Sequence, residues 1–219
     1  MKPTIIRAEQ ILANWLQSEV PSLQYTIDEM RELRGDLLAR EPDLAHRITE
    51  MRRRIIEEAV RRSGIDHAEA VSHHAIEVFL TARNTIDFFP GALDTLRALS
   101  GSYILGALSN GNADISRLGL NDIFSFGFSA EEVGLPKPAP DLFLQALRET
   151  GVGPESVVYV GDDPVLDIDA ASAIGMRTVW MNSRAKPRGA SEPGATITDI
   201  RDLPGAIAGI AQAPDTASH

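Results

Sequence analysis

The segment VVYVGDDPVLDID (Val157–Asp169) begins as an apolar run and ends in a cluster of carboxylates. Its first residues indicate a buried strand, since short apolar runs bounded by glycine are typical of parallel sheets. The acidic residues after Gly161 are Asp162, Asp163, Asp167 and Asp169. One interpretation is that they cap the next helix, because acidic side chains are favoured at helix N-termini. The other is that they surround a cation, and hard oxygens after a strand are typical of a Mg²⁺ site.

Strands alternate with helices on both sides of this segment. Strands are predicted at 102–109, 123–129, 156–161 and 177–181, and helices at 93–99 and 140–151. This order predicts an α/β fold, with a parallel sheet covered by helices on both faces. Residues before 86 show only helical spacing of their apolar side chains. We therefore expect a helical domain at 1–85, an α/β core domain at 86–210 and a flexible tail at 211–219.

The composition narrows the functional classes. The chain has 219 residues, no cysteine and a net charge of −10. The lack of cysteine excludes disulfides and thiolate zinc sites, and the negative charge argues against nucleic acid as a partner. No apolar stretch has the 18 or so residues of a membrane span, and the first residues lack the apolar centre of a signal peptide. We expect a cytoplasmic protein without a membrane partner, and association into a homo-oligomer is left open.

Two further polar segments follow predicted strands, at the sheet edge where ligands bind in open parallel sheets. Ser109 and Asn110 follow the first strand, and a hydroxyl beside exposed amides suits a phosphate oxygen. A plain turn is the alternative. Lys137 lies between Pro136 and Pro138, which would fix the position of its charge. A stiff surface loop is the alternative there. The chain has 3 lysines against 18 arginines, so a lysine inside a motif stands out.

In this order and spacing, the three segments resemble the haloacid dehalogenase-like hydrolase superfamily. LGALSNGNAD (105–114) resembles its second motif, GLPKPAPDLF (134–143) its third and GDDPVLDIDAASAIGM (161–176) its fourth. The resemblance implies a Rossmann-like parallel sheet core. It also implies that residues 1–85 form the α-helical cap that family members place over the substrate.

The resemblance also implies a chemistry, that of a Mg²⁺-dependent phosphatase acting on a small phosphorylated metabolite. The segment of Ser109 and Asn110 would bind the phosphoryl group, and Lys137 would neutralise charge on the nucleophile and the phosphate. Asp162 would ligate Mg²⁺, and Asp167 would support the metal or its waters. The Gly-Asp pair at 161–162 favours the magnesium phosphatases over the metal-free dehalogenases that share the fold.

The family's first motif, a strand ending in Asp-x-Asp, has no counterpart before the helical region. Its first aspartate is the nucleophile that becomes phosphorylated. We therefore expect this chain to be inactive as given, with its first core strand missing. In the family that strand lies between the strands that here end at Ser109 and Gly161. Two interpretations stay open: a phosphatase whose printed sequence is truncated or starts at the wrong place, or a non-catalytic phosphate-binding, metal-binding or interaction protein derived from the same fold.

Overall fold

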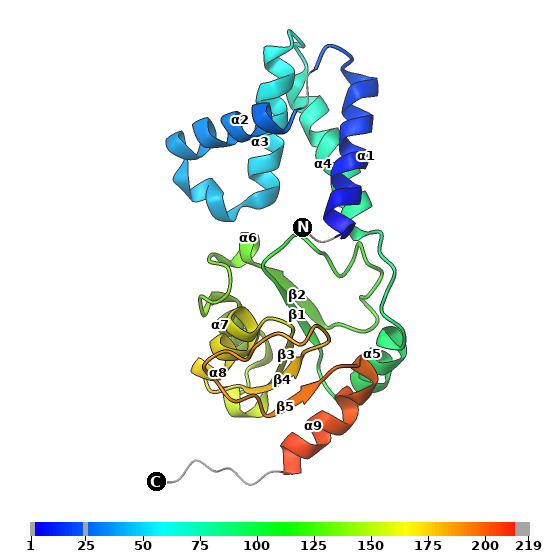
Figure 1. The fold of residues 1–219 in the computed structure, drawn as a ribbon, viewed down its shortest axis with the longest axis vertical. Helices are drawn as coiled ribbons and strands as arrows, with labels where there is room; N and C mark the ends of the chain where they lie inside the picture. Colours follow the sequence, from blue (N-terminus) through cyan, green and yellow to red (C-terminus); the bar gives the residue numbers. More distant parts are fainter. Residues whose placement is uncertain (1–2, 24–25, 213–219) are drawn as a thin grey trace. The chain divides into compact units, whose positions relative to one another are not determined.

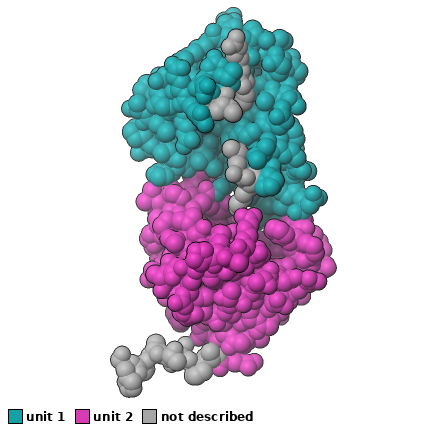
Figure 2. Space-filling view, viewed as in Figure 1, with its two compact units in different colours: residues 1–87, 111–120 teal, residues 88–110, 121–219 magenta. Residues whose placement is uncertain are grey.

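The chain consists of two compact units in a computed structural model that describes residues 3–23 and 26–212. Unit 1 comprises residues 1–87 and 111–120, and unit 2 comprises residues 88–110 and 121–219 (Figure 2). Unit 1 thus includes residues 111–120, which were expected in the core domain at 86–210. Residues 213–219 of the expected tail lie outside the described residues.

Unit 1 is built from helices (Figure 1). They are α1 (Pro3–Glu19), α2 (Ile27–Arg40), the 3₁₀ turn η1 (Pro42–His46), α3 (Ile48–Arg62) and α4 (Ala68–Asn84). Helical spacing brings Leu12 and Leu16 of α1 to one buried face, where they join Ile56 of α3 and Phe79 of α4 in a single apolar core. None of the helices described in either unit combines the length and apolar character needed to cross a bilayer.

Unit 2 contains the strands. They are β1 (Gly106–Ser109), β2 (Phe126–Ser129), β3 (Val158–Gly161), β4 (Arg177–Met181) and β5 (Ala195–Ile197). Its α-helices are α5 (Ala92–Ser100), α6 (Ala130–Val133), α7 (Asp141–Thr150), α8 (Ala170–Ala173) and α9 (Leu203–Gln212). Two 3₁₀ turns, η2 (Pro154–Ser156) and η4 (Ile200–Asp202), and a π-helical segment, η3 (Pro164–Asp169), complete the unit. Every strand pair is parallel, which confirms the predicted α/β class. Strand β5 was not predicted, because three residues are too few to show a periodic pattern.

The strands form two sheets where the sequence indicates one. β1 pairs with β2, and β3, β4 and β5 pair in that order. The register places Ser109 opposite Ser129 and Gly161 opposite Trp180. Within residues 3–23 and 26–212, no backbone ladder joins β1 to β3. This is the place where the family resemblance puts the strand of the first motif.

Helices cover both faces of the three-stranded sheet (Figure 1). Val158 and Val160 of β3 face the cluster that contains Leu203 of α9. Tyr159, between them, points to the opposite face, because side chains alternate along a strand. There it packs on Phe143 of α7, with ring centroids 4.9 Å apart in an edge-to-face arrangement. The alternation of β3 thus decides that the tyrosine lies on the α7 side.

Helix α7 offers a test of this packing. Leu142 is 0% exposed and Leu144 is 39% exposed on the same helix. We expect Leu142→Ala to lower the free energy of unfolding by about 2–5 kcal/mol, because it leaves a cavity. The matched control Leu144→Ala should cost less than about 1 kcal/mol. Urea unfolding followed by circular dichroism measures both, and equal losses would contradict the placement of α7.

Candidate functional site

The segment of Lys137 is fastened to the end of β1 by Asn110. The side-chain amide of Asn110 donates to the carbonyl of Lys137 (2.8 Å), and the Lys137 N–H donates to Asn110 Oδ1 (2.7 Å). The Lys137–Pro138 peptide is cis. Ser109 is half-buried and ends β1 directly before Asn110. The structure therefore brings the second and third predicted segments together through one asparagine.

The Lys137 ammonium links the two sheets. Its Nζ lies 2.7 Å from Asp167 Oδ1, 2.7 Å from the Tyr159 hydroxyl and 3.3 Å from the Leu108 carbonyl oxygen. An ammonium has three N–H donors, so these three acceptors use all of them. The Lys137 and Asp167 side chains are each 9% exposed. A direct bond from Lys137 to a phosphate would thus require the release of one acceptor, and the Leu108 carbonyl is the most distant.

Asp167 shapes the loop that follows β3. Its Oδ1 is bonded to Lys137, and its Oδ2 accepts the backbone N–H groups of Asp162 (3.1 Å) and Asp163 (3.0 Å). The carboxylate can lie this close to the strand only because residue 161 is glycine. A Cβ on Gly161 would come within 2.3 Å of the Asp167 Cβ. Both oxygens of Asp167 are thus engaged, and the residue holds the loop that carries Asp162. Its predicted support of a metal or of metal-bound waters stays a prediction.

Tyr159 is a site residue that sequence reasoning missed. Its hydroxyl accepts from Lys137 and donates to Asp167 Oδ1 (3.2 Å). Burial raises the pKa of the phenol, and the negative charge of Asp167 raises it further. The tyrosine therefore stays protonated and remains a donor to the carboxylate. The available signal was a single hydroxyl in an otherwise apolar strand, Val158–Gly161.

Two more of the four aspartates, besides Asp167, accept hydrogen bonds from backbone amides. Asp163 Oδ1 accepts the N–H groups of Val165 and Leu166 at the start of η3, so the capping interpretation is confirmed for this residue. These hydrogen bonds hold the pKa of the Asp163 carboxyl below its usual range, and the bond from Leu166 has the largest effect. Asp169 accepts the N–H groups of Ala190 and Ser191, which also lowers its pKa. It therefore fastens the loop that follows β4.

Asp162 is left as the outward-facing carboxylate of the cluster. Its side chain is 58% exposed, and the ammonium of Lys186 lies 3.6 Å from its Oδ2. In the part of the chain that the structure describes, no group of three or more acidic or histidine side chains is arranged to hold a metal ion. Mg²⁺ commonly keeps several waters and takes only one or two carboxylates from the protein. The single Asp162 carboxylate fits part of such a ligand set.

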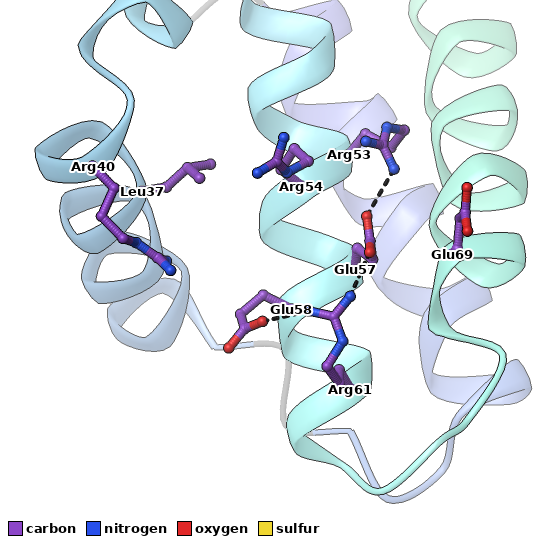
Figure 3. A pocket seen from close by; sticks show the side chains of 8 residues that line it. All are labelled: Leu37, Arg40, Arg53, Arg54, Glu57, Glu58, Arg61 and Glu69. Carbon is purple, nitrogen blue, oxygen red and sulfur yellow. Dashed lines mark hydrogen bonds and ion pairs between the residues drawn. The ribbon is translucent and has the colours of Figure 1, made fainter.

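Charged side chains also surround a cavity in unit 1, where they form ion pairs with one another. A cavity of about 390 Å³ lies among α2, α3 and α4 (Figure 3). On its wall Arg53 and Arg61 of α3 both bond to Glu57, and Arg61 also bonds to Glu58. Such i,i+3 and i,i+4 pairs stabilise a helix surface. The cavity wall is therefore an ion-paired helix surface, in which these arginine charges are compensated.

Two proteins that are named as phosphatases are similar in sequence to this chain. The chain matches the haloacid dehalogenase-like hydrolase family over residues 4–175. It is 32% identical to the 5-amino-6-(5-phospho-D-ribitylamino)uracil phosphatase YigB of Escherichia coli, over 82% of this chain and 77% of that protein. It is also 32% identical to a phosphoserine phosphatase of Thermus thermophilus, over 69% of this chain and 63% of that protein. The match thus spans less than two thirds of the second relative.

Solved structures agree on the fold. The crystal structure of a 2-haloacid dehalogenase from Pseudomonas syringae pv. Tomato superposes with a TM-score of 0.90 at 38% identity, over 94% of this chain and 92% of that one. A phosphatase structure from Thermococcus onnurineus, at 22% identity and a TM-score of 0.54, shares the fold. With the family match over residues 4–175, these findings show that the chain belongs to the haloacid dehalogenase-like hydrolase family.

Proposed function

We propose that the site at the ends of β1 and β3 is that of a Mg²⁺-dependent phosphatase acting on a small phosphorylated metabolite. The observation that carries the proposal is the exposed Asp162 carboxylate, held beyond β3 by the buried Asp167–Lys137 pair. A carboxylate directed to solvent beside a fixed cation suits a ligand that carries both a metal and an anion. The phosphatase names of two relatives support the same class.

Each residue has a proposed task. Mg²⁺, when bound, would neutralise negative charge on the phosphoryl oxygens. Asp162 would hold it through a carboxylate oxygen, while Asp167 keeps the Asp162 backbone in place. The amides that follow Ser109 would bind phosphoryl oxygens. Lys137 would provide positive potential from a fixed position, because Asn110 holds its backbone and Asp167 holds its ammonium.

The reaction also needs a nucleophile. In this family's chemistry an aspartate attacks phosphorus to form an aspartyl-phosphate. The Asp-x-Asp that the sequence contains, Asp167 and Asp169, is engaged elsewhere, since Lys137 holds the first residue and loop amides hold the second. We propose that this chain alone does not form the covalent intermediate. A strand ending in Asp-x-Asp between β1 and β3 would complete the site. In the described ranges 3–23 and 26–212 no ladder joins these two strands, which supports this proposal.

A second candidate function is hydrolysis of a 2-haloacid. It is favoured by the 38% identity and TM-score of 0.90 to the dehalogenase of Pseudomonas syringae. The two functions differ in the group released, phosphate or halide, and in their need for Mg²⁺. A non-catalytic protein would bind phosphate or metal at the same residues without releasing either group.

The activity test compares the 219-residue chain with a form extended before Met1 by an apolar strand of roughly fifteen residues that ends in Asp-x-Asp. We expect the turnover of the 219-residue chain on phosphomonoesters to lie far below the usual range of about 1–1000 per second. The extended form should release phosphate with Mg²⁺ and stop when EDTA removes the metal. Phosphate release is measured by a colorimetric assay.

The same samples are tested with 2-chloropropionate. Halide release by the extended form without Mg²⁺ would establish the dehalogenase instead. Release of phosphate by the 219-residue chain at an ordinary enzyme rate would show that this chain contains its own nucleophile, which would contradict our expectation. Binding of phosphate and Mg²⁺ by both forms without turnover would support the non-catalytic protein.

The metal assignment has its own test. Asp162→Asn should weaken Mg²⁺ binding at least about tenfold, because the substitution replaces a charged oxygen ligand by a neutral one. The matched control is Asp122→Asn, which removes an exposed carboxylate from the loop before β2. Isothermal titration calorimetry measures both affinities. If Asp162→Asn and Asp122→Asn bind Mg²⁺ equally well, Asp162 is not the ligand.

A further inference from the structure

A second lysine approaches the acidic loop from the segment after β4. The Nζ of Lys186 donates to the Asp162 carbonyl oxygen (3.0 Å) and lies 3.6 Å from both Asp162 Oδ2 and Asp163 Oδ2. Its side chain is 30% exposed. The carboxylate proposed to bind Mg²⁺ therefore already faces a cation that belongs to the chain itself.

The loop that carries Lys186 is anchored at both ends. The side-chain amide of Asn182 donates to the Lys186 carbonyl (3.1 Å), and the Lys186 N–H donates to Asn182 Oδ1 (2.8 Å). This is the arrangement that Asn110 makes with Lys137. At the far end, Asp169 accepts the amides of residues 190 and 191. The approach of Lys186 to Asp162 is thus set by the backbone of the loop.

The ammonium groups of Lys137 and Lys186 differ in how firmly their hydrogen-bond partners hold them. All three N–H donors of Lys137 reach acceptors within 3.3 Å, and its side chain is nearly buried. Within the part of the chain that the structure describes, Lys186 makes one hydrogen bond to a carbonyl and two longer ion pairs, and its side chain is 30% exposed. Lys186 can therefore move away from the carboxylates at a smaller cost, because water can replace its partners.

A metal ion and the Lys186 ammonium would both bind to the same carboxylate, that of Asp162. A cation bound to Asp162 Oδ2 would lie close to Nζ, which is only 3.6 Å from that oxygen. Like charges at such separations repel strongly, and more so near a protein surface than in bulk water. Asp163 faces the same ammonium, but its Oδ1 is occupied by the amides of η3. The competition thus concerns chiefly the Asp162 carboxylate.

We propose that Lys186 is an internal counter-ion that competes with Mg²⁺ for the Asp162 carboxylate. In this arrangement the loop of residues 182–191 lowers the metal affinity of the site, and metal binding moves the Lys186 ammonium away from Asp162. The inference rests on the proposed function for the identity of the metal. It adds a control of metal affinity by a residue outside the three motifs.

The first experiment is calorimetric titration of Mg²⁺ into the full chain. We expect Lys186→Met to bind Mg²⁺ about tenfold more tightly than the parent, because the competing charge is gone. Lys186→Arg keeps the charge and should stay near the parent. The matched control is Arg188→Met, which removes a charge two residues along the same loop, where the arginine pairs with Glu192. Its affinity should stay within about twofold, because exposed charges are screened.

The second experiment follows the ammonium directly. The chain has 3 lysines, so selective ¹³Cε labelling gives three NMR signals, and Lys186→Met identifies that of Lys186. On addition of Mg²⁺ this signal should shift toward that of a solvent-exposed lysine, as its carboxylate partners are lost. Thermal melts check that each variant is folded.

An unchanged or lower Mg²⁺ affinity of Lys186→Met would overturn the inference, as would a Lys186 signal that Mg²⁺ does not move. Failure of the proposed function is distinguishable. If Lys186→Met binds Mg²⁺ more tightly but the extended form releases no phosphate, the counter-ion role stands and the phosphatase assignment fails. If phosphate is released but the affinity does not rise, the function stands and the counter-ion role fails.

Discussion

The site depends on the buried contact between the Lys137 ammonium and the Asp167 carboxylate, 2.7 Å apart. Burying two charges is costly, and the cost is offset only when the remaining donors and acceptors are also bonded. The remaining groups are bonded here. The Tyr159 hydroxyl and the Leu108 carbonyl accept the other two N–H groups of the Lys137 ammonium, and two loop amides donate to the Asp167 carboxylate. Losing either charge would leave the other unpaired, which typically costs about 3–5 kcal/mol.

This contact also connects parts of unit 2 that no backbone ladder joins in the described residues. Leu108 belongs to β1 and Tyr159 to β3, and Lys137 is bonded to both. Asn110 adds a link from the end of β1 to the lysine backbone. The relative placement of the two strand ends is therefore maintained by side chains of the site itself. The residues that support the strand ends are thus the same ones to which we assign the proposed electrostatic role.

The aspartates after β3 share a charge but differ in their partners. Asp163 caps η3, Asp167 neutralises Lys137, and Asp169 fastens the loop after β4. Backbone amides or a buried cation satisfy these three carboxylates. Asp162 is turned to solvent, with Lys186 as its neighbour. In our proposal, Asp162 is the one of these four carboxylates whose cation partner can exchange.

Much of the fold follows from the sequence. Helical spacing predicts unit 1, and apolar runs predict β1 to β4 and the α/β class, because periodicity reflects which side of one element is buried. The strand-end positions of Asn110 and Asp162 were predicted for the same reason. The division of the strands into two sheets was not, because hydrogen-bonded partners of a strand are not encoded in its own pattern.

The roles within the site were decided by tertiary structure. Four neighbouring aspartates look alike in the sequence, and their different tasks come from groups far along the chain, such as Lys137 for Asp167 and Ala190 for Asp169. The positions of Tyr159 and Lys186 likewise depend on strand alternation and on an asparagine that fixes a loop. The sequence by itself determined which segments reach the carboxyl edge of the sheet. Only the folded chain decided which charge meets which, because an ion pair depends on distances of a few ångströms between residues that sequence spacing does not relate.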